Sequence, residues 1–281
     1  MSQLNSTVKS VGESIIPTGS FLQGERFHTV SSRFQPIQPS LVASRLEAHG
    51  FQAVSLLTGR SRHEDKVDFQ RTISRFRETS SHGIDGLHVD VIYISKHMGR
   101  GQDEIRLGLY RGLCANQWTA GTIIETIKIR HTGNAWSDLE EGLIQIVAQR
   151  NKFLKVIEEM RKVKLTYTQA QDLARSMALT RLEKVSSLRE FGSDALLNFR
   201  REGDQGNDLF TVMNVIQENV IRFPVGYTVN SRDRDGNPVT RNQTTRRLKE
   251  SSGSLVALNA ALFDRGFALL PVNVQTELRA A

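Results

Sequence analysis

The chain has 281 residues, of which 38% are hydrophobic, so it can bury a core without disulfides or metal staples. Its formal net charge of +7 favours a polyanionic partner, because clustered Lys and Arg side chains release counterions from phosphates. The single cysteine, Cys114, excludes an internal disulfide framework and a multi-cysteine zinc site, and indicates a reducing compartment such as a bacterial cytoplasm.

Residues 1–20 read as a polar N-terminal arm, which we expect to be mobile. They lack the basic start and continuous apolar run of a signal peptide. No run of about 18 apolar residues occurs, so the sequence predicts no transmembrane helix and no membrane partner. We expect residues 21–281 to form a single α+β domain.

The segment from residue 21 to residue 77 mixes helix and strand signals. Ser40 can cap a helix through Glu47, and residues 51–59 read as a strand. Residues 60–77 are rich in both charges, and the choice between helix and strand stays open there.

The clearest strand signals lie between Leu87 and Thr132. Apolar residues alternate with a period of two over 87–94 and again over 105–110, which predicts a hairpin. Gly99 and Gly101 suit the turn, although they could also form a backbone nest for an anion. A third strand over 122–132 places Lys128 and Arg130 on one face, so one side of this antiparallel sheet should be basic.

Helical periodicity follows the sheet. Ser137 and Glu140 form a capping box before an amphipathic pattern over 138–162, and Thr168 and Gln171 offer a second box. Three more helices are predicted: 169–185, 207–222 and 254–270. Between the last two, residues 222–250 have few apolar side chains and an Asp235-Gly236 turn signal, which indicates a basic hairpin or loop insertion.

The sequence contains no recognisable catalytic centre. There is no glycine-rich phosphate loop followed by Lys-Ser or Lys-Thr, and the seven histidines show no metal-ligand spacing. Cys114 lies in an apolar stretch, where a lone thiol is more often a small buried hydrophobe than a nucleophile. We therefore predict no catalytic residue, no metal and no cofactor.

Basic and aromatic residues form the candidate nucleic-acid interface, because arginines that follow phosphates beside stacking rings are typical of single-strand binding. Tyr110 and Trp118 could equally be core residues, and His131 could stack on a base or hydrogen-bond locally. The candidates are Lys96, Arg100, Arg106, Tyr110, Arg111, Trp118, Lys128, Arg130, His131, Arg232, Arg234, Arg241, Arg246, Arg247 and Lys249.

Several stretches resemble the phage and plasmid protein family catalogued as a domain of unknown function, number 932. They are FHTVSSRFQPI, LGLYRGLCANQ, IRHTG and LVALNAALFDRG, with Arg111, Cys114, Asn116, His131 and Gly133 among the positions that carry the likeness. The resemblance implies a mobile-element protein of the bacterial cytoplasm, without catalytic residues to carry over. The expected hairpin, sheet and helix also look similar to the core of phage single-strand annealing proteins, which is an analogy of fold alone.

The leading hypothesis is a phage-encoded protein that binds single-stranded DNA, assembles as a homo-oligomer and anneals strands without ATP. One alternative is a protein-interaction, inhibitor or scaffold role in which the basic arm meets an acidic protein surface. A second alternative is an enzyme acting on nucleic acid, with a site assembled from scattered residues, which divalent-metal dependence of turnover would favour.

Overall fold

A computed structural model describes residues 25–58, 62–79, 87–98, 101–111, 114–119, 124, 126–182, 188–246, 248 and 253–280. The N-terminal arm predicted for residues 1–20 lies outside the described residues. Where we expected one domain over 21–281, contacts group the chain into two compact units. Unit 1 comprises described residues up to 115 and from 124 to 150, and unit 2 comprises those from 116 to 119 and from 151 onward.

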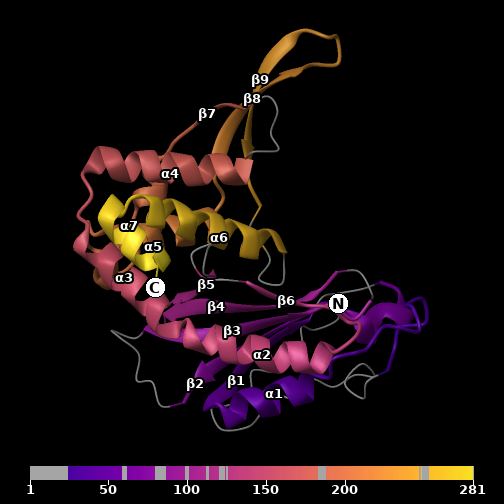
Figure 1. Cartoon of the computed structure of the whole chain (residues 1–281). Helices are drawn as coiled ribbons and strands as arrows, with labels where there is room; N and C mark the ends of the chain where they lie inside the picture. Colours follow the sequence, from indigo (N-terminus) through magenta and orange to yellow (C-terminus); the bar gives the residue numbers. More distant parts are fainter. Residues whose placement is uncertain are drawn as a thin grey trace. The chain divides into compact units, whose positions relative to one another are not determined.

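Unit 1 is built on an antiparallel sheet, as the sequence predicted (Figure 1). The strand order is β1-β2-β3-β4-β5, and β6 also pairs with β4. The strands are β1 (Phe51–Thr58), β2 (Thr72–Glu78), β3 (Leu87–Ser95), β4 (Asp103–Arg111), β5 (Cys114–Thr119) and β6 (Ile127–Ile129). The predicted α+β class, with a sheet followed by helices, is confirmed.

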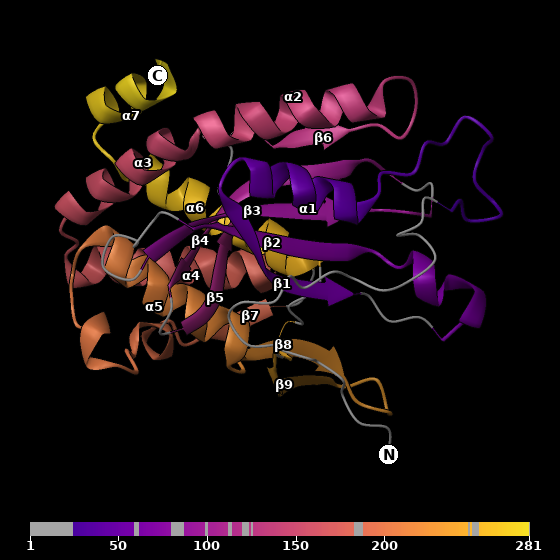
Figure 2. The ribbon, with the colours of Figure 1, turned by 90° about the horizontal axis from the view of Figure 1, so that it is seen from below.

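The alternation along β3 explains the two faces of this sheet. Tyr93 pairs with Ile105 of β4 on the face covered by α1 (Pro39–Ala48) and α2 (Ala135–Ala148), as Figure 2 shows. Gly142 of α2 lies directly against the side chains of Ile127 and Ile105. The other face carries Arg75, which pairs with Ile92, because neighbouring residues of a strand point to opposite faces.

The charged stretch over 60–77 resolves into two elements. A 3-10 helix, η2 (Glu64–Phe69), precedes β2, which lies between β1 and β3. In β2 the buried residues Ile73 and Phe76 lie on opposite faces, and Arg75 and Arg77 share one face. The many charged residues left this strand unrecognised in the sequence. An Arg side chain can lie on a sheet when its aliphatic part packs there and its guanidinium is paired.

The single helix predicted over 138–162 is two helices. α2 ends at Ala148 and α3 (Arg150–Lys162) follows after Gln149. Leu139, Leu143 and Ile146 of α2 are buried in unit 1, whereas Phe153 of α3 contacts Phe263 in unit 2 with 5.3 Å between ring centroids. The apolar stripes thus serve two different cores, and the helical pattern in the sequence does not reveal the interruption.

Unit 2 packs helices around α5 (Leu209–Arg222), whose residues from Val212 to Ile221 are all buried. The other helices are α3, α4 (Tyr167–Leu182), α6 (Gly253–Ala268) and α7 (Val272–Ala280). Short 3-10 turns, η3 (Asp194–Leu197) and η4 (Glu202–Asp204), lead into α5. A second antiparallel sheet has the order β7 (Leu188–Phe191), β8 (Gly226–Arg232) and β9 (Pro238–Thr244).

The helix starts differ from the predicted capping boxes by a few residues. α2 begins at Ala135, so Ser137 lies inside the helix. At α4 the reciprocal box is formed by Thr166 and Gln169: the Thr166 backbone N–H donates to Gln169 Oε1 at 2.9 Å, and the Gln169 N–H donates to Thr166 Oγ1 at 3.3 Å. Within the described part of the chain, no helix is long and apolar enough to span a membrane.

Candidate nucleic-acid interface

The predicted basic insertion is a two-stranded ribbon formed by β8 and β9, which extends past the helices of unit 2 (Figure 1). Six of the seven residues of β9 are exposed. A two-stranded hairpin is marginally stable by itself, and here β7 supports the ribbon by pairing with the first half of β8. β9 is therefore exposed surface, whereas Val229 of β8 is buried.

Asp233 closes the ribbon's loop. Its carboxylate accepts the backbone N–H groups of Asn237 at 2.8 Å and Asp235 at 2.9 Å, and Gly236 adopts a positive φ of 87°. The bond from the Asn237 backbone is the main reason that the pKa of Asp233 lies below its ordinary value. This carboxylate therefore holds the turn and forms no ion pair with the arginines beside it.

Four of the predicted arginines lie on this ribbon or directly after it: Arg232 in β8, Arg234 in the connecting turn, Arg241 in β9 and Arg246 two residues beyond β9. We call the ribbon together with Arg246 the arginine ribbon. All four are exposed. Arg232 donates to the Gly236 carbonyl at 2.7 Å and Arg241 donates to the Arg232 carbonyl at 3.3 Å. Within the described residues none of the four has a carboxylate partner, so their charges are not neutralised.

A groove lies at the base of the ribbon. It has a volume of ≈ 320 Å³ and is lined by both strands and by Gly192. Tyr227 lines it and donates to Gln243 Oε1 at 2.9 Å. Thr228 and Asn242 add polar groups, so the groove combines one aromatic ring with several hydrogen-bonding side chains.

In unit 1, two of the predicted phosphate contacts are engaged in ion pairs. Glu104 receives Lys96 Nζ at 2.6 Å and Arg106 Nη2 at 2.7 Å. Burial works against the charged form of Glu104, but the bonds from these two cations outweigh it and lower the pKa of the carboxyl. The charges of Lys96 and Arg106 are therefore paired with Glu104 rather than presented to a phosphate.

The two basic residues predicted on the third strand, Lys128 and Arg130, differ from Lys96 and Arg106 in having no carboxylate partner among the described residues. Both side chains are exposed. Among the described residues of the strand predicted over 122–132, Ile127–Ile129 form a strand. These two cations add a second, smaller basic surface to unit 1.

His131 is buried, with both ring nitrogens hydrogen-bonded. Nε2 lies 2.8 Å from Asp103 Oδ1 and Nδ1 lies 3.1 Å from the Gln35 carbonyl. Burial disfavours the charged ring, yet the bond to Asp103 and its charge outweigh this and raise the pKa of His131. Asp103 also accepts the Lys96 backbone N–H at 2.7 Å and the Tyr93 hydroxyl. The structure thus places His131 in a local hydrogen-bond network, the second of the two roles considered for it.

The remaining predicted residues cannot be placed at this interface. Arg100, Arg247 and Lys249 lie outside the described residues. Tyr110 and Arg111 end β4 and Trp118 lies in β5, and only their backbone is described. Cys114 begins β5.

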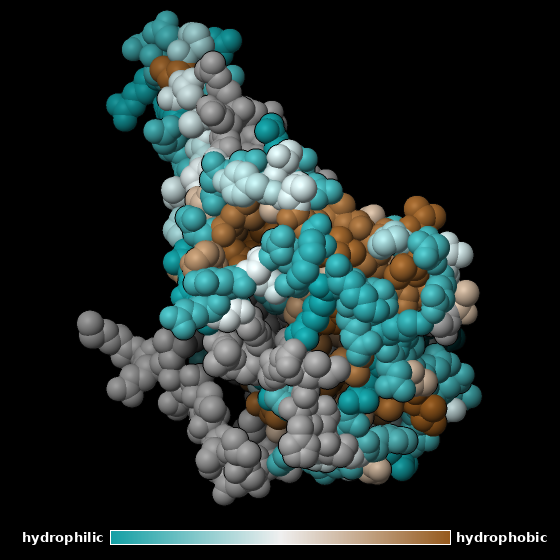
Figure 3. Space-filling view, turned by 90° about the vertical axis from the view of Figure 1, so that its left-hand side faces the viewer, coloured by the Kyte–Doolittle hydropathy of each residue, from teal (hydrophilic) through white to brown (hydrophobic). Residues whose placement is uncertain are grey.

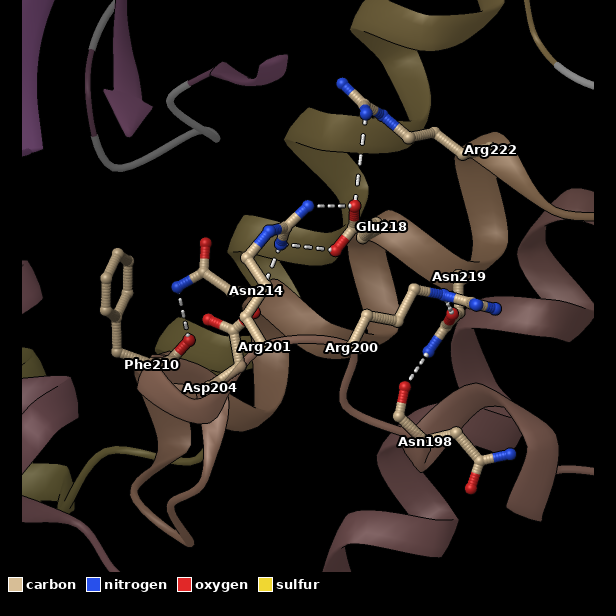
Figure 4. A network of polar contacts seen from close by, with 9 residues as sticks. All are labelled: Asn198, Arg200, Arg201, Asp204, Phe210, Asn214, Glu218, Asn219 and Arg222. Carbon is tan, nitrogen blue, oxygen red and sulfur yellow. Dashed lines mark hydrogen bonds and ion pairs between the residues drawn. The ribbon is translucent and has the colours of Figure 1, made fainter. Parts of the chain in front are cut away.

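Two polar groups were missed by sequence reasoning. On the sheet, Arg77 forms a two-bond contact with Asp90 at 2.9 and 3.2 Å, and Arg75 lies 3.1 Å from the same carboxylate. The i, i+2 spacing of Arg75 and Arg77, which places both on one face of a strand, was the only signal of this cluster in the sequence. In unit 2, Arg201 binds Glu218 of α5 at 2.6 and 2.8 Å (Figure 4). No local pattern in the sequence predicted the pair of Arg201 and Glu218.

The described residues contain no group of three or more His, Cys, Asp or Glu side chains that could hold a metal ion. Asp103, His131 and Tyr93 do gather, but they satisfy one another by hydrogen bonds. The arrangement that the structure offers at its surface is therefore one of exposed cations and polar side chains.

Comparison with known proteins matches residues 26–252 to the family model described as "Domain of unknown function (DUF932)". The UPF0380 protein YafZ of Escherichia coli (strain K12) is 25% identical over 206 residues, which are 70% of this chain and 71% of the relative. The UPF0380 protein YfjQ of the same strain is 24% identical with the same coverage. No solved structure matches the chain significantly.

Proposed function

The chain belongs to the DUF932 family, and from this premise we propose that it binds single-stranded DNA, without catalysing a reaction on it, through the arginine ribbon. The family's description names no activity, and the support for this function comes from the exposed side chains. The observation that carries it is the set of four exposed arginines whose charges no carboxylate among the described residues neutralises.

Unpaired arginines favour a phosphate partner for two reasons. A guanidinium presents a planar fork of donors that matches phosphate oxygens, and each cation that meets a phosphate releases condensed counterions. The backbone bonds of Arg232 and Arg241 use single N–H groups and leave the other donors for a ligand.

The groove with Tyr227 favours a single strand over a duplex. Unpaired bases expose their flat faces and can stack on an aromatic ring, whereas paired bases cannot. A two-stranded ribbon also fits the major groove of a duplex, so duplex binding is the rival outcome to measure.

The test is fluorescence anisotropy with labelled single-stranded and double-stranded oligonucleotides over a salt series. The variant Arg232→Ala/Arg234→Ala/Arg241→Ala should bind single strands more weakly. Its slope of log K against log salt should be shallower by about 2, since each phosphate contact contributes about 0.7. The control Arg33→Ala/Lys162→Ala/Arg175→Ala removes the same charge from exposed positions elsewhere and should change the slope little.

Equal weakening by both triple variants would show that net charge, not the ribbon, governs binding. If the protein binds duplex DNA more tightly than single strands, the ligand of the ribbon is a duplex and the single-strand proposal is wrong. If no nucleic acid binds at low salt, an acidic protein surface becomes the better partner for the ribbon.

Annealing and oligomerisation are further parts of the same proposal. Annealing requires two strands to be held at once, which an assembly of several ribbons would provide. Mass in solution and the ATP-free pairing of complementary labelled strands test both parts with the same protein. A monomer that binds but does not speed pairing would restrict the function to binding.

A further inference from the structure

We propose that a pocket in unit 2, which we call the α4–α5 pocket, is a binding site for a nucleobase. The delivery of that base by a bound strand rests on the proposed function, whereas the recognition of a free nucleoside does not. The pocket has a volume of ≈ 460 Å³ and lies between the first turn of α4, the chain from η3 to α5, and α5 itself. This volume is within the range of small-ligand sites.

The floor of the pocket is apolar. Leu165, Ala170, Leu197, Val212 and Val215 line it. Figure 3 shows hydrophobic side chains gathered in a hollow on the face of the molecule that carries these helices. An apolar floor removes the flat face of a ring from water, which is the main source of affinity for an aromatic ligand.

Two exposed aromatic rings lie at this pocket. Tyr167 is 64% exposed and Phe199 is 53% exposed, and they are the two aromatic residues among the exposed large hydrophobics of the described chain. Aromatic rings usually contribute to stability through burial, so two such rings beside one apolar hollow indicate a ligand that covers them. Base-on-ring stacking suits this arrangement and tolerates any base.

A buried carboxylate supplies a polar group beside the apolar floor. Asp204 is 4% exposed, lines the pocket and accepts Arg201 Nη1 at 3.1 Å. Its carboxylate oxygens only accept hydrogen bonds, so they favour a ligand that brings donors to this edge of the pocket. The amino groups of nucleobases are such donors, and carboxylates pair with the amino group of cytosine in known recognition chemistry.

A network of polar contacts holds the chain between η3 and α5 against α5 (Figure 4). Arg201 joins Asp204 to Glu218 of α5 by bonds of 2.6 and 2.8 Å to the latter. Asn219 Nδ2 donates to the carbonyls of Leu196 and Asn198, each at 3.0 Å. These bonds tie the chain that carries Phe199 and Asp204 to the central helix, so little ordering is needed when a ligand binds.

The backbone next to the pocket is also paired. The Leu165 N–H donates to the Asn207 carbonyl and the Leu209 N–H donates to the Val163 carbonyl, each at 2.8 Å. The chain before α4 and the chain before α5 thus form a short antiparallel bridge at one wall. The network of Arg201, Asp204 and Glu218 and this bridge therefore keep the pocket preformed.

The test begins with a free, uncharged nucleoside, so that phosphate contacts play no part. Adenosine and cytidine at millimolar concentration should give saturation-transfer NMR signals with the full chain. The signals should vanish in Tyr167→Ala/Phe199→Ala and remain in the ring-keeping variant Tyr167→Phe/Phe199→Tyr. They should also remain in the control Leu179→Ala/Leu269→Ala, which removes exposed side chains elsewhere in unit 2.

The second arm compares a single-stranded oligonucleotide with one of equal length that carries abasic sites. The intact protein should bind the base-containing strand on the order of tenfold more tightly, and Tyr167→Ala/Phe199→Ala should lose this preference. The arginine-ribbon variant should bind both strands more weakly but keep their ratio.

The outcomes separate the two proposals. Oligonucleotide binding without a nucleoside signal, and unaffected by Tyr167→Ala/Phe199→Ala, would overturn the base pocket and leave the ribbon proposal standing. A nucleoside signal that depends on these rings, without oligonucleotide binding, would support the pocket for free nucleosides or nucleotides and overturn the ribbon proposal. Signals of equal strength in the double variant would place the nucleoside elsewhere and overturn the pocket.

Discussion

At the scale of single residues, His97 and His131, both buried in unit 1, have opposite pKa shifts. His131 is bound to Asp103 and its pKa is raised, whereas burial lowers the pKa of His97 to about 4. The ring of His97 contacts Ser95, and that of His131 stacks on Phe34 with 4.4 Å between centroids. The hydrogen bond to Asp103 distinguishes them: His131 makes this bond, whereas burial of His97 outweighs the attraction of the same carboxylate for its charged ring.

These shifts predict a stability maximum near pH 6.5, the ordinary pKa of an unfolded histidine. The contribution of His131 is complete below pH 6.5 and is lost as pH rises through its raised folded value. The contribution of His97 is complete above pH 6.5 and is lost as pH falls toward 4, by an amount on the order of 3 kcal/mol.

Urea unfolding at pH 4.5, 6.5 and 8 checks this prediction by difference from the parent protein. His131→Gln should flatten the decline on the alkaline side, and His97→Gln should flatten the decline on the acid side. Since carboxylates such as Asp90 and Glu104 also titrate in acid, each histidine is judged against its own variant. An unchanged profile in either variant would contradict the assigned shift.

At the scale of elements, α2 packs on the sheet through a glycine. A Cβ added at Gly142 would lie 2.7 Å from Ile127 Cγ2 and 3.4 Å from Ile105 Cδ1. Glycine weakens the interior of a helix by about 1 kcal/mol relative to alanine, so its presence here is explained by the close approach of helix and strand.

We therefore expect Gly142→Ala to destabilise the protein. Overpacking costs about 1–3 kcal/mol and the gain in helix propensity is about 1 kcal/mol, so the free energy of unfolding should fall by up to about 2 kcal/mol. Urea unfolding followed by circular dichroism measures it. Ile144→Ala on the exposed side of the same helix is the control and should change stability by less than about 0.5 kcal/mol. A stability gain in Gly142→Ala would mean that β6 shifts readily.

At the scale of the whole molecule, the described chain has two cores. Tyr93, Ile105 and Ile129 belong to the core of unit 1, whereas Phe153 and Phe263 belong to that of unit 2. The chain passes between the units after residues 115, 123 and 150. Proteins with separate cores commonly depart from a single all-or-none transition.

We expect the two units to unfold as separate cooperative regions. Hydrogen exchange measured by mass spectrometry in low urea should show Gly142→Ala speeding exchange in peptides of β3, β4 and α2 while leaving α5 nearly unchanged. Equal acceleration in α5 would instead show that the units unfold together.

Local patterns in the sequence were sufficient for several elements. The alternation over 87–94 and 105–110 predicted β3 and β4, and Asp235-Gly236 predicted the turn of the arginine ribbon. Helical spacing located α4 and α5, and the α+β class followed from these elements. Such signals lie within a few neighbouring residues, which is why they can be read without knowledge of the fold.

The use of each charged residue was decided only by the tertiary structure. The sequence alone does not distinguish basic residues that are paired from those that are not. Lys96 and Arg106 contact Glu104 and His131 contacts Asp103. Arg232 and Arg241 have no carboxylate partner in the described chain. The α4–α5 pocket likewise joins residues from α4, η3, η4 and α5. The sequence by itself determined several of the helices and strands and the excess of basic residues. Strand register and long-range packing decided which cations are neutralised, because ion pairs form between residues that only folding brings together.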